Sequence, residues 1–228
     1  MVKIVELLSP AKDMTTLSSA IKNGADSVYV GLDGYNMRAN VSNFSMEDIK
    51  EAVARCHEAG VKLYVCINTS LNQGEIEKLK DSMPLIKKSK VDAVIASDLG
   101  AVKLARDSNM EVHMSVQANI TNTESLNVLK DLGVSRIILS RELPIQTIQE
   151  IAVNSPLELE VFVHGAMCVA VSGRCFLSSY LYNKSANCGE CLQPCRKEWK
   201  IVSEDAEEFV LGANDFNVIE EPKVHEEV

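Results

Sequence analysis

The sequence predicts an α/β protein of the (β/α)8 barrel (TIM-type) class, truncated before the eighth strand, with a Cys-rich insertion after strand seven. Seven short apolar runs, rich in Val and Ile, alternate with amphipathic stretches. Such runs are typical of parallel strands buried on both faces. Segments such as GADSVYV and GVSRIIL recur along the chain, which indicates a repeated strand–helix unit. Five of the seven cysteines fall between Cys168 and Cys195.

The elements follow in strict strand–helix order. The expected strands cover residues 3–8, 27–32, 62–67, 93–97, 111–116, 136–140 and 159–165. The expected helices cover residues 13–23, 45–59, 74–88, 100–107, 123–132 and 144–153. Ser45 followed by Asp48 resembles a capping box. Gly24, Gly60 and Gly133 lie just before the next strand, where glycine commonly ends a helix.

A closed barrel is favoured over an open doubly wound sheet, because the segment LLSPAKD after the first apolar run is not a Gly-rich phosphate loop. A closed barrel needs an eighth strand, and the chain ends after what resembles the start of one more helix. We therefore expect a fragment. Its parts are barrel strands one to seven with their helices (1–165), a Cys-rich cluster-binding segment (166–200) and the start of the last barrel unit (201–228).

The chain has 228 residues and a net charge of −9. An acidic chain is a poor general binder of nucleic acid, because neutralising phosphates requires clustered cations. Two local basic clusters remain, at Lys87, Lys88 and Lys90 and at Arg196, Lys197 and Lys200. No apolar run is long enough to span a membrane. The N-terminus is predicted to form a strand and not a signal peptide, so a cytoplasmic location is the default expectation.

Functional residues of (β/α)8 barrels lie at the C-terminal ends of the strands. The polar residues expected there are Glu6, Ser9, Asn36, Arg38, Asn68, Thr69, Ser97, Asp98, Ser115, Gln117, Asn119, Ser140, Arg141, Glu142 and His164. Arg141 would suit a carboxylate or phosphate, and the adjacent Glu142 could act as an acid or base. We expect Arg141, Glu142, Gln117 and His164 to hold a substrate.

The clustered cysteines follow the pattern C-x6-C-x12-C-x2-C-x3-C. Thiolates at such short separations bind zinc or an iron–sulfur cluster, and thiols in the cytoplasm rarely form disulfides. A structural zinc site often uses two CxxC pairs, whereas this stretch has one, Cys188 to Cys191. Cys56, in an expected helix, and Cys66, in an expected strand, are assigned to the core.

Hydrolytic chemistry finds less support in the motifs. The sequence contains neither GxSxG nor HExxH. His164 lies four residues before Cys168, so a Cys–His nucleophile remains an alternative. With four other thiols alongside, a lone nucleophile explains the stretch less well.

The segment ELEVFVHGAMCVAVSGRCFLSSYL (158–181) resembles the signature of peptidase family U-32, the collagenase-like proteases. The residues that carry it are Glu160, Phe162, Gly165, Ala166, Cys168, Gly173, Arg174, Cys175 and Ser178. GADSVYVG, HMSVQANITN, LSREL and CxxxCR extend the likeness over essentially the whole chain.

The resemblance implies two activities. The family name implies proteolysis, whereas better-understood relatives assist oxygen-independent hydroxylation of RNA bases or ubiquinone precursors and hold a 4Fe–4S cluster. It implies Cys168, Cys175, Cys191 and Cys195 as cluster ligands, with Cys188 as a substitute. The expected substrates are thus RNA or a small aromatic acid for a hydroxylase, and a peptide for a peptidase with Cys168 or a serine as nucleophile. A third alternative is a structural, zinc-bound barrel.

Overall fold

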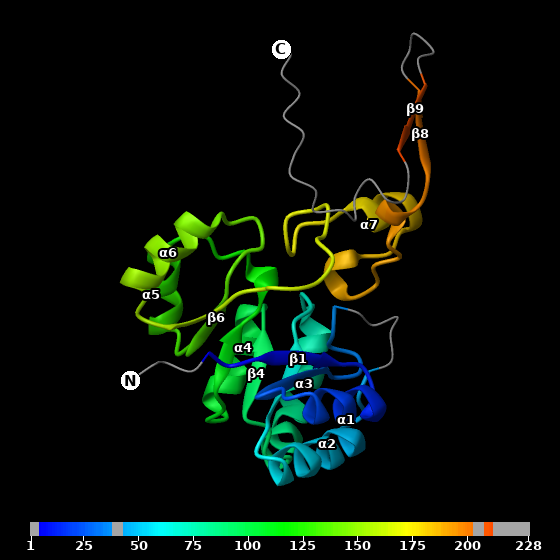
Figure 1. Cartoon of the computed structure of the whole chain (residues 1–228). Helices are drawn as coiled ribbons and strands as arrows, with labels where there is room; N and C mark the ends of the chain where they lie inside the picture. Colours follow the sequence, from blue (N-terminus) through cyan, green and yellow to red (C-terminus); the bar gives the residue numbers. More distant parts are fainter. Residues whose placement is uncertain (1–4, 38–42, 203–207, 212–228) are drawn as a thin grey trace.

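The computed structural model describes residues 5–37, 43–202 and 208–211. Seven parallel strands form one sheet, each paired with the next in sequence, and the sheet curls into a half-barrel (Figure 1). The strands are β1 (Leu8–Ala11), β2 (Ser27–Gly31), β3 (Lys62–Ile67), β4 (Ala93–Ala96), β5 (Val112–Met114), β6 (Arg136–Ile138) and β7 (Glu158–Glu160). The connecting helices are α1 (Met14–Lys22), α2 (Met46–Glu58), α3 (Gln73–Lys88), α4 (Leu99–Asp107), α5 (Thr123–Asp131) and α6 (Ile145–Asn154). The α/β barrel-like class is confirmed.

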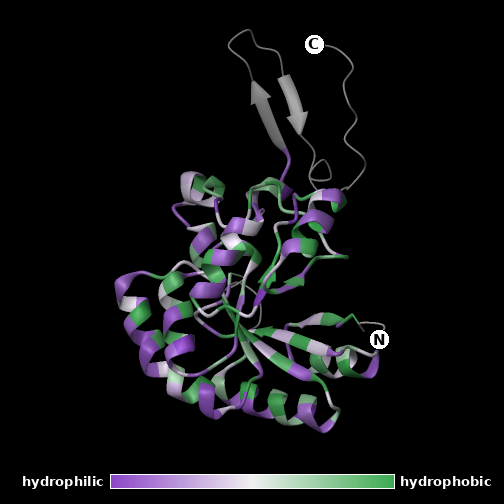
Figure 2. Ribbon diagram, turned by 90° about the vertical axis from the view of Figure 1, so that its left-hand side faces the viewer, coloured by the Kyte–Doolittle hydropathy of each residue, from purple (hydrophilic) through white to green (hydrophobic). Residues whose placement is uncertain are grey.

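Both faces of the sheet are buried, as the near-continuous apolar runs predict. In β3, Leu63, Val65 and Ile67 pack against the helices, and Tyr64 and Cys66 face the concave side. Figure 2 shows apolar strands at the centre and mixed polar and apolar helices outside them. Cys66 and Cys56 are both buried, which confirms their assignment to the core.

The helix ends follow the expected local chemistry. The Ser45 hydroxyl caps α2, and Asp48 completes the capping box by accepting from the Ser45 backbone N–H. Gly24 and Gly60 follow α1 and α2 with φ of 88° and 72°, in the left-handed region where glycine has no steric penalty.

The first strand lies later in the sequence than predicted, and this moves Glu6 to the other end of the barrel. Pairing with β2 starts at Leu8 and includes Pro10, which an edge strand tolerates. Glu6 therefore precedes β1 instead of following it. Its side chain contacts Ser27 and Arg136, which begin β2 and β6. The prediction that Glu6 lies at the C-terminal end of a strand is wrong.

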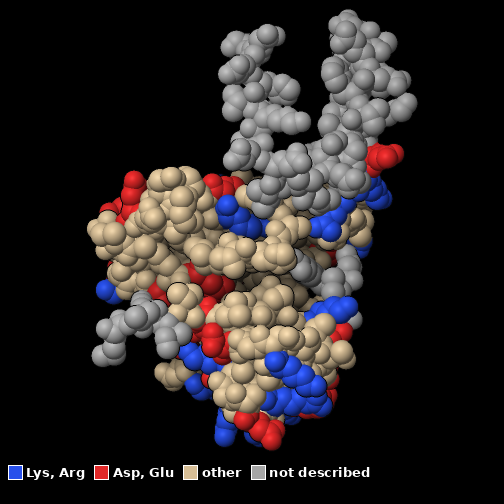
Figure 3. All heavy atoms as spheres, viewed as in Figure 1, with Lys and Arg blue, Asp and Glu red and all other residues tan. Residues whose placement is uncertain are grey.

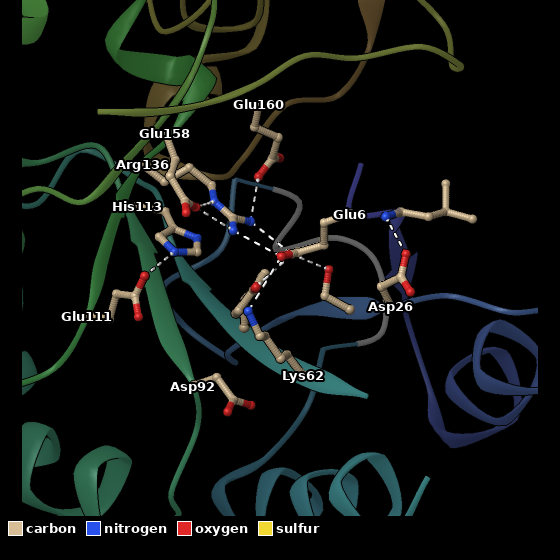
Figure 4. Close-up of polar contacts among 12 residues, drawn as sticks. Glu6, Asp26, Lys62, Asp92, Glu111, His113, Arg136, Glu158 and Glu160 are labelled. Atoms are coloured by element: carbon tan, nitrogen blue, oxygen red, sulfur yellow. Dashed lines mark hydrogen bonds and ion pairs between the residues drawn. The ribbon is translucent and has the colours of Figure 1, made fainter. Parts of the chain in front are cut away.

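The concave side holds a charged cluster centred on Arg136 (Figure 4). Arg136 Nη1 and Nη2 donate to the two Glu6 carboxylate oxygens at 2.9 and 3.0 Å. Its Nε and Nη2 donate to Glu158 at 3.1 and 2.9 Å. Tyr64 donates to Glu6 at 2.7 Å, and the guanidinium lies 5.5 Å from the Tyr64 ring centre. Arg136 thus links β6, β7 and the chain before β1, while its hydrogen bonds hold the pKa of Glu6 far below the usual range.

Glu160 is the least satisfied member of this cluster. Its buried Oε2 has no hydrogen-bond partner among the described residues and lies 3.8 Å from Arg136 Nη1. Burial raises the pKa of Glu160 from 4.5 to about 7, against the opposing attraction of Arg136. The folded protein therefore holds this proton more tightly than the unfolded chain does.

Residues 199–202 and 208–211 form an antiparallel pair, β8 (Trp199–Val202) and β9 (Glu208–Leu211), which projects from the half-barrel (Figure 1). The sequence suggested the start of a further helical barrel unit there. A hairpin occupies this part of the chain instead, and the rest of 201–228 lies outside the described residues. The proposed domain boundaries stay predictions. In the described part of the chain, no helix is long and apolar enough to cross a membrane.

We expect Arg136→Met to lower the free energy of unfolding by roughly 3 kcal/mol, because it removes the donor to both Glu6 oxygens in a partly buried site and leaves Glu6 only Lys62, 3.5 Å away. Urea unfolding at neutral pH measures this. Arg55→Met is the matched control, since Arg55 pairs with Glu51 on the surface and such pairs contribute about 0.5 kcal/mol. Equal losses in the two variants would contradict the central role of Arg136.

We expect Glu160→Gln to stabilise the protein at pH 8 by roughly 2 kcal/mol and to change little at pH 5. The unfolded chain loses the Glu160 proton near pH 4.5, whereas the folded protein holds it up to about pH 7, so the destabilisation builds up between these two values and is complete above pH 7. Unfolding experiments across this range measure the difference. Glu158→Gln is the control, because the exposed Glu158 pairs with the same Arg136 and its loss should not stabilise at pH 8.

Candidate metal centre

The Cys-rich segment covers the C-terminal ends of several strands. It contains α7 (Leu177–Tyr182) and the short 3-10 turns η2 (Ala186–Cys188) and η3 (Pro194–Arg196). The backbone N–H of Ser70, after β3, donates to the carbonyl of Asn187 at 3.0 Å. Arg141 Nη2, after β6, donates to the hydroxyl of the buried Ser172 at 2.8 Å. The segment is thus joined to the barrel end that carries function in barrels of this class.

Gly173 makes the closest approach between the segment and the barrel. Its φ is 73°, and a Cβ at this position would lie 2.2 Å from the Gln117 carbonyl oxygen. Any larger residue would push the segment off the loop that follows β5. The requirement for glycine here is therefore both conformational and steric.

Two side chains brace the segment internally. The Cys175 backbone N–H donates to Asn187 Oδ1 at 3.1 Å. The Leu192 N–H donates to the hydroxyl of Ser178, whose side chain is fully buried. These contacts connect the part of the chain around Cys175 with the part around Cys191. They therefore hold the two halves of the cysteine pattern next to each other.

Cys195 lies near three of the other clustered thiols. Burial raises the pKa of Cys195, and electrostatic repulsion from Cys168, Cys191 and Cys175 raises it further. Cys168 and Cys188 are exposed, whereas Cys175, Cys191 and Cys195 are partly buried. Among the described residues, no three His, Cys, Asp or Glu side chains are arranged closely enough to ligate a metal ion. The donor set is nevertheless of the soft type that zinc and iron–sulfur clusters require.

The four predicted substrate-binding residues have different surroundings. Arg141 and Gln117 lie together beneath Ser172 and Gly173, and Arg141 Nε is buried with no hydrogen-bond partner among the described residues. Glu142 is exposed and accepts from the Ser140 hydroxyl. His164 is exposed after β7 and makes no hydrogen bond or ion pair within the described chain. The structure thus joins Arg141 and Gln117 to the Cys-rich segment but not Glu142 or His164.

Several of the other polar residues predicted at strand ends form hydrogen bonds that fix the neighbouring loops. Asn68 accepts from the Met37 N–H, Ser97 donates to the Asn68 carbonyl, and Asp98 caps α4. Arg38 lies outside the described residues. Sequence reasoning missed Ser172 as the partner of Arg141, although its place beside Gly173 in the SGRC motif was a usable signal.

Comparisons with known proteins identify a family model and several relatives that match this chain. The model of peptidase family U32 matches residues 12–224. An uncharacterized protease of Methanocaldococcus jannaschii is 48% identical over 90% of this chain and 51% of its own length. The tRNA hydroxylation protein P of Haemophilus influenzae is 41% identical over 86% of this chain and 43% of its own. The chain thus spans about half the length of these curated relatives.

A solved U32 peptidase structure superposes with a TM-score of 0.61. The match covers 72% of this chain and 70% of that structure, at 15% sequence identity. A likeness at this level of identity bears on the fold alone. It supports the curled arrangement of parallel strands and helices described above.

We expect Gly173→Ala to loosen the Cys-rich segment from the barrel. Alkylation of Cys175 and Cys195 in the reduced protein should accelerate roughly tenfold, because a local opening made easier by about 1.4 kcal/mol exposes them more often. Mass spectrometry of alkylated peptides measures this. Gly34→Ala is the matched control, since Gly34 has a similar φ of 79° but no atom within 4 Å of the added Cβ. Equal acceleration in both variants would exclude steric docking at Gly173.

Proposed function

The chain belongs to peptidase family U32, and we propose that its Cys-rich segment holds a 4Fe–4S cluster that serves oxygen-independent hydroxylation of RNA. The observation that carries the proposal is the set of four soft thiol donors, Cys168, Cys175, Cys191 and Cys195, in a segment that is held against the C-terminal end of the sheet. The likeness to a tRNA hydroxylation protein supports RNA as the substrate class. A tRNA substrate would also make the cytoplasm the place of action.

The chain's own residues would have distinct tasks in this proposal. Cys168, Cys175, Cys191 and Cys195 would ligate the cluster, and a bound 4Fe–4S cluster supplies electron transfer. A cluster would bind these cysteines as thiolates, and its iron ions would offset the repulsion between neighbouring thiolates that contributes to the raised pKa of Cys195. Arg141, held under the segment by Ser172, would present its guanidinium to a phosphate or carboxylate of the substrate. A small aromatic acid is the alternative substrate that this arginine would also suit.

Proteolysis is the second candidate function, favoured by the close relative that is named a protease. In the described chain, however, His164 makes no hydrogen bond to Cys168, although a Cys–His nucleophile depends on such contact. A structural zinc site is the third alternative. Proteolysis by a Cys–His pair needs no metal and a structural site needs zinc, whereas the cluster proposal needs iron and sulfide in the purified protein.

Anaerobically purified protein should be brown, with about four iron and four sulfide per chain. Cys168→Ala and Cys175→Ala should each lose most of this iron and the visible absorption. Cys188→Ala is the matched control and should retain both, because the proposal places Cys188 outside the four ligands. Colourless protein with one zinc, or peptide cleavage that survives Cys168→Ala and Cys175→Ala, would contradict the proposal.

A further inference from the structure

The Cys-rich segment displays aromatic rings to solvent. Phe176 and Tyr180 are 71% and 87% exposed. They lie four residues apart, and the Tyr180 N–H donates to the Phe176 carbonyl at 2.8 Å, so one helical turn places both rings on the same side. Among side chains that the structure describes, every aromatic ring more than about a third exposed lies between Phe162 and Tyr182. The exposed rings are thus gathered in one part of the molecule.

The Cys-rich segment also carries exposed cations, in a chain that is acidic overall. Within the segment the exposed cations are Arg174, Lys184, Arg196 and Lys197. Lys197 lies 5.1 Å from the Tyr182 ring centre, and Lys184 pairs with Glu190. Arg174 and Arg196 make no ion pair within the described chain. Figure 3 shows Lys and Arg side chains on the face where α7 lies in Figure 1.

We infer that this aromatic and basic surface, formed by α7 and the residues just before it and called the stacking face, binds unpaired nucleotides of an RNA, with bases stacked on Phe176 and Tyr180 and a phosphate near Arg174. Exposed rings beside cations suit single-stranded nucleic acid, since every base has a face that stacks and every nucleotide a phosphate. Bases inside a duplex are already stacked and offer no such face. A protein partner would favour an interface centre depleted of charge, whereas here the exposed Arg174 lies two residues before Phe176 and makes no ion pair within the described chain.

This inference rests on the proposed function and extends it to the substrate's conformation. Phe176 directly follows Cys175, one of the four proposed ligands. A base stacked on Phe176 would therefore lie beside the metal centre, and the target nucleotide would have to be unpaired. Loops of folded RNA molecules meet this condition.

Fluorescence anisotropy with a fluorescein-labelled RNA stem–loop tests the inference, with the matching blunt duplex as competitor. We expect the stem–loop to bind more tightly than the duplex. Phe176→Ala with Tyr180→Ala should weaken binding at least about tenfold, because each stacked base contributes on that scale. Tyr180→Phe, which keeps the ring, and Val153→Ala, an exposed apolar control on α6, should bind as the wild type does.

Salt dependence separates stacking from phosphate contact. Arg174→Ala should flatten the plot of log affinity against log salt concentration by about 0.7, since each phosphate contact releases about 0.7 counterions from a single strand. The double aromatic variant should keep the wild-type slope. Lys80→Ala, an exposed cation on α3, is the control and should change neither quantity.

Equal binding by wild type and the double aromatic variant, equal affinity for stem–loop and duplex, or no RNA binding at all would overturn the inference. So would a dimer of the wild type that the double aromatic variant breaks without changing RNA affinity. The binding assay needs no hydroxylation, so the two proposals fail separately. Ring-dependent RNA binding by a protein without cluster or hydroxylation would refute only the proposed function, whereas hydroxylation unaffected by loss of both rings would refute only the stacking face.

Discussion

One guanidinium group connects parts of the sheet that backbone pairing leaves apart. The seven strands pair only with their neighbours, so the described chain has no hydrogen-bonded ladder between β1 and β7. Arg136 reaches Glu6 before β1 and Glu158 in β7 from its place in β6. Because charges in a partly buried site are costly without partners, the cluster strongly favours the curled shape. It lies at the N-terminal end of the strands, which leaves the opposite end to the cysteine segment.

The Cys-rich segment depends on that curled shape. It contacts the barrel after β3, β5 and β6, and these three places adjoin one another only when the sheet is curved. The contacts at Gly173 and Asn187 involve barrel backbone, which leaves little room for adjustment. The position of the thiols is therefore a consequence of strand curvature as much as of cysteine spacing. The family resemblance points to the same residues, since Glu160 in the charged cluster and Gly173 in the segment both belong to its signature.

Hydrophobic periodicity was sufficient to predict the alternation of strands and helices, because both faces of a parallel sheet are buried and its runs are distinctive. It misplaced the first strand, because the apolar residues Val5 and Leu7 are exposed beside the sheet and the strand itself contains Pro10. The spacing of the cysteines was enough to predict them as metal ligands, but no motif predicted the charged cluster around Arg136. Arg136 and Glu6 lie far apart in sequence, and only the three-dimensional path of the strands brings them together.

The two outer strands of the half-barrel also bear on how copies of this chain behave at high concentration. An unpaired strand edge can recruit another chain and start aggregation. Here β1 contains Pro10, which has no N–H to offer, and β7 has only three residues, two of them glutamates. A second chain that approached β1 would find no N–H donor at Pro10. One that approached β7 would face Glu158 and Glu160. The composition of β1 and β7 thus disfavours self-association through these edges.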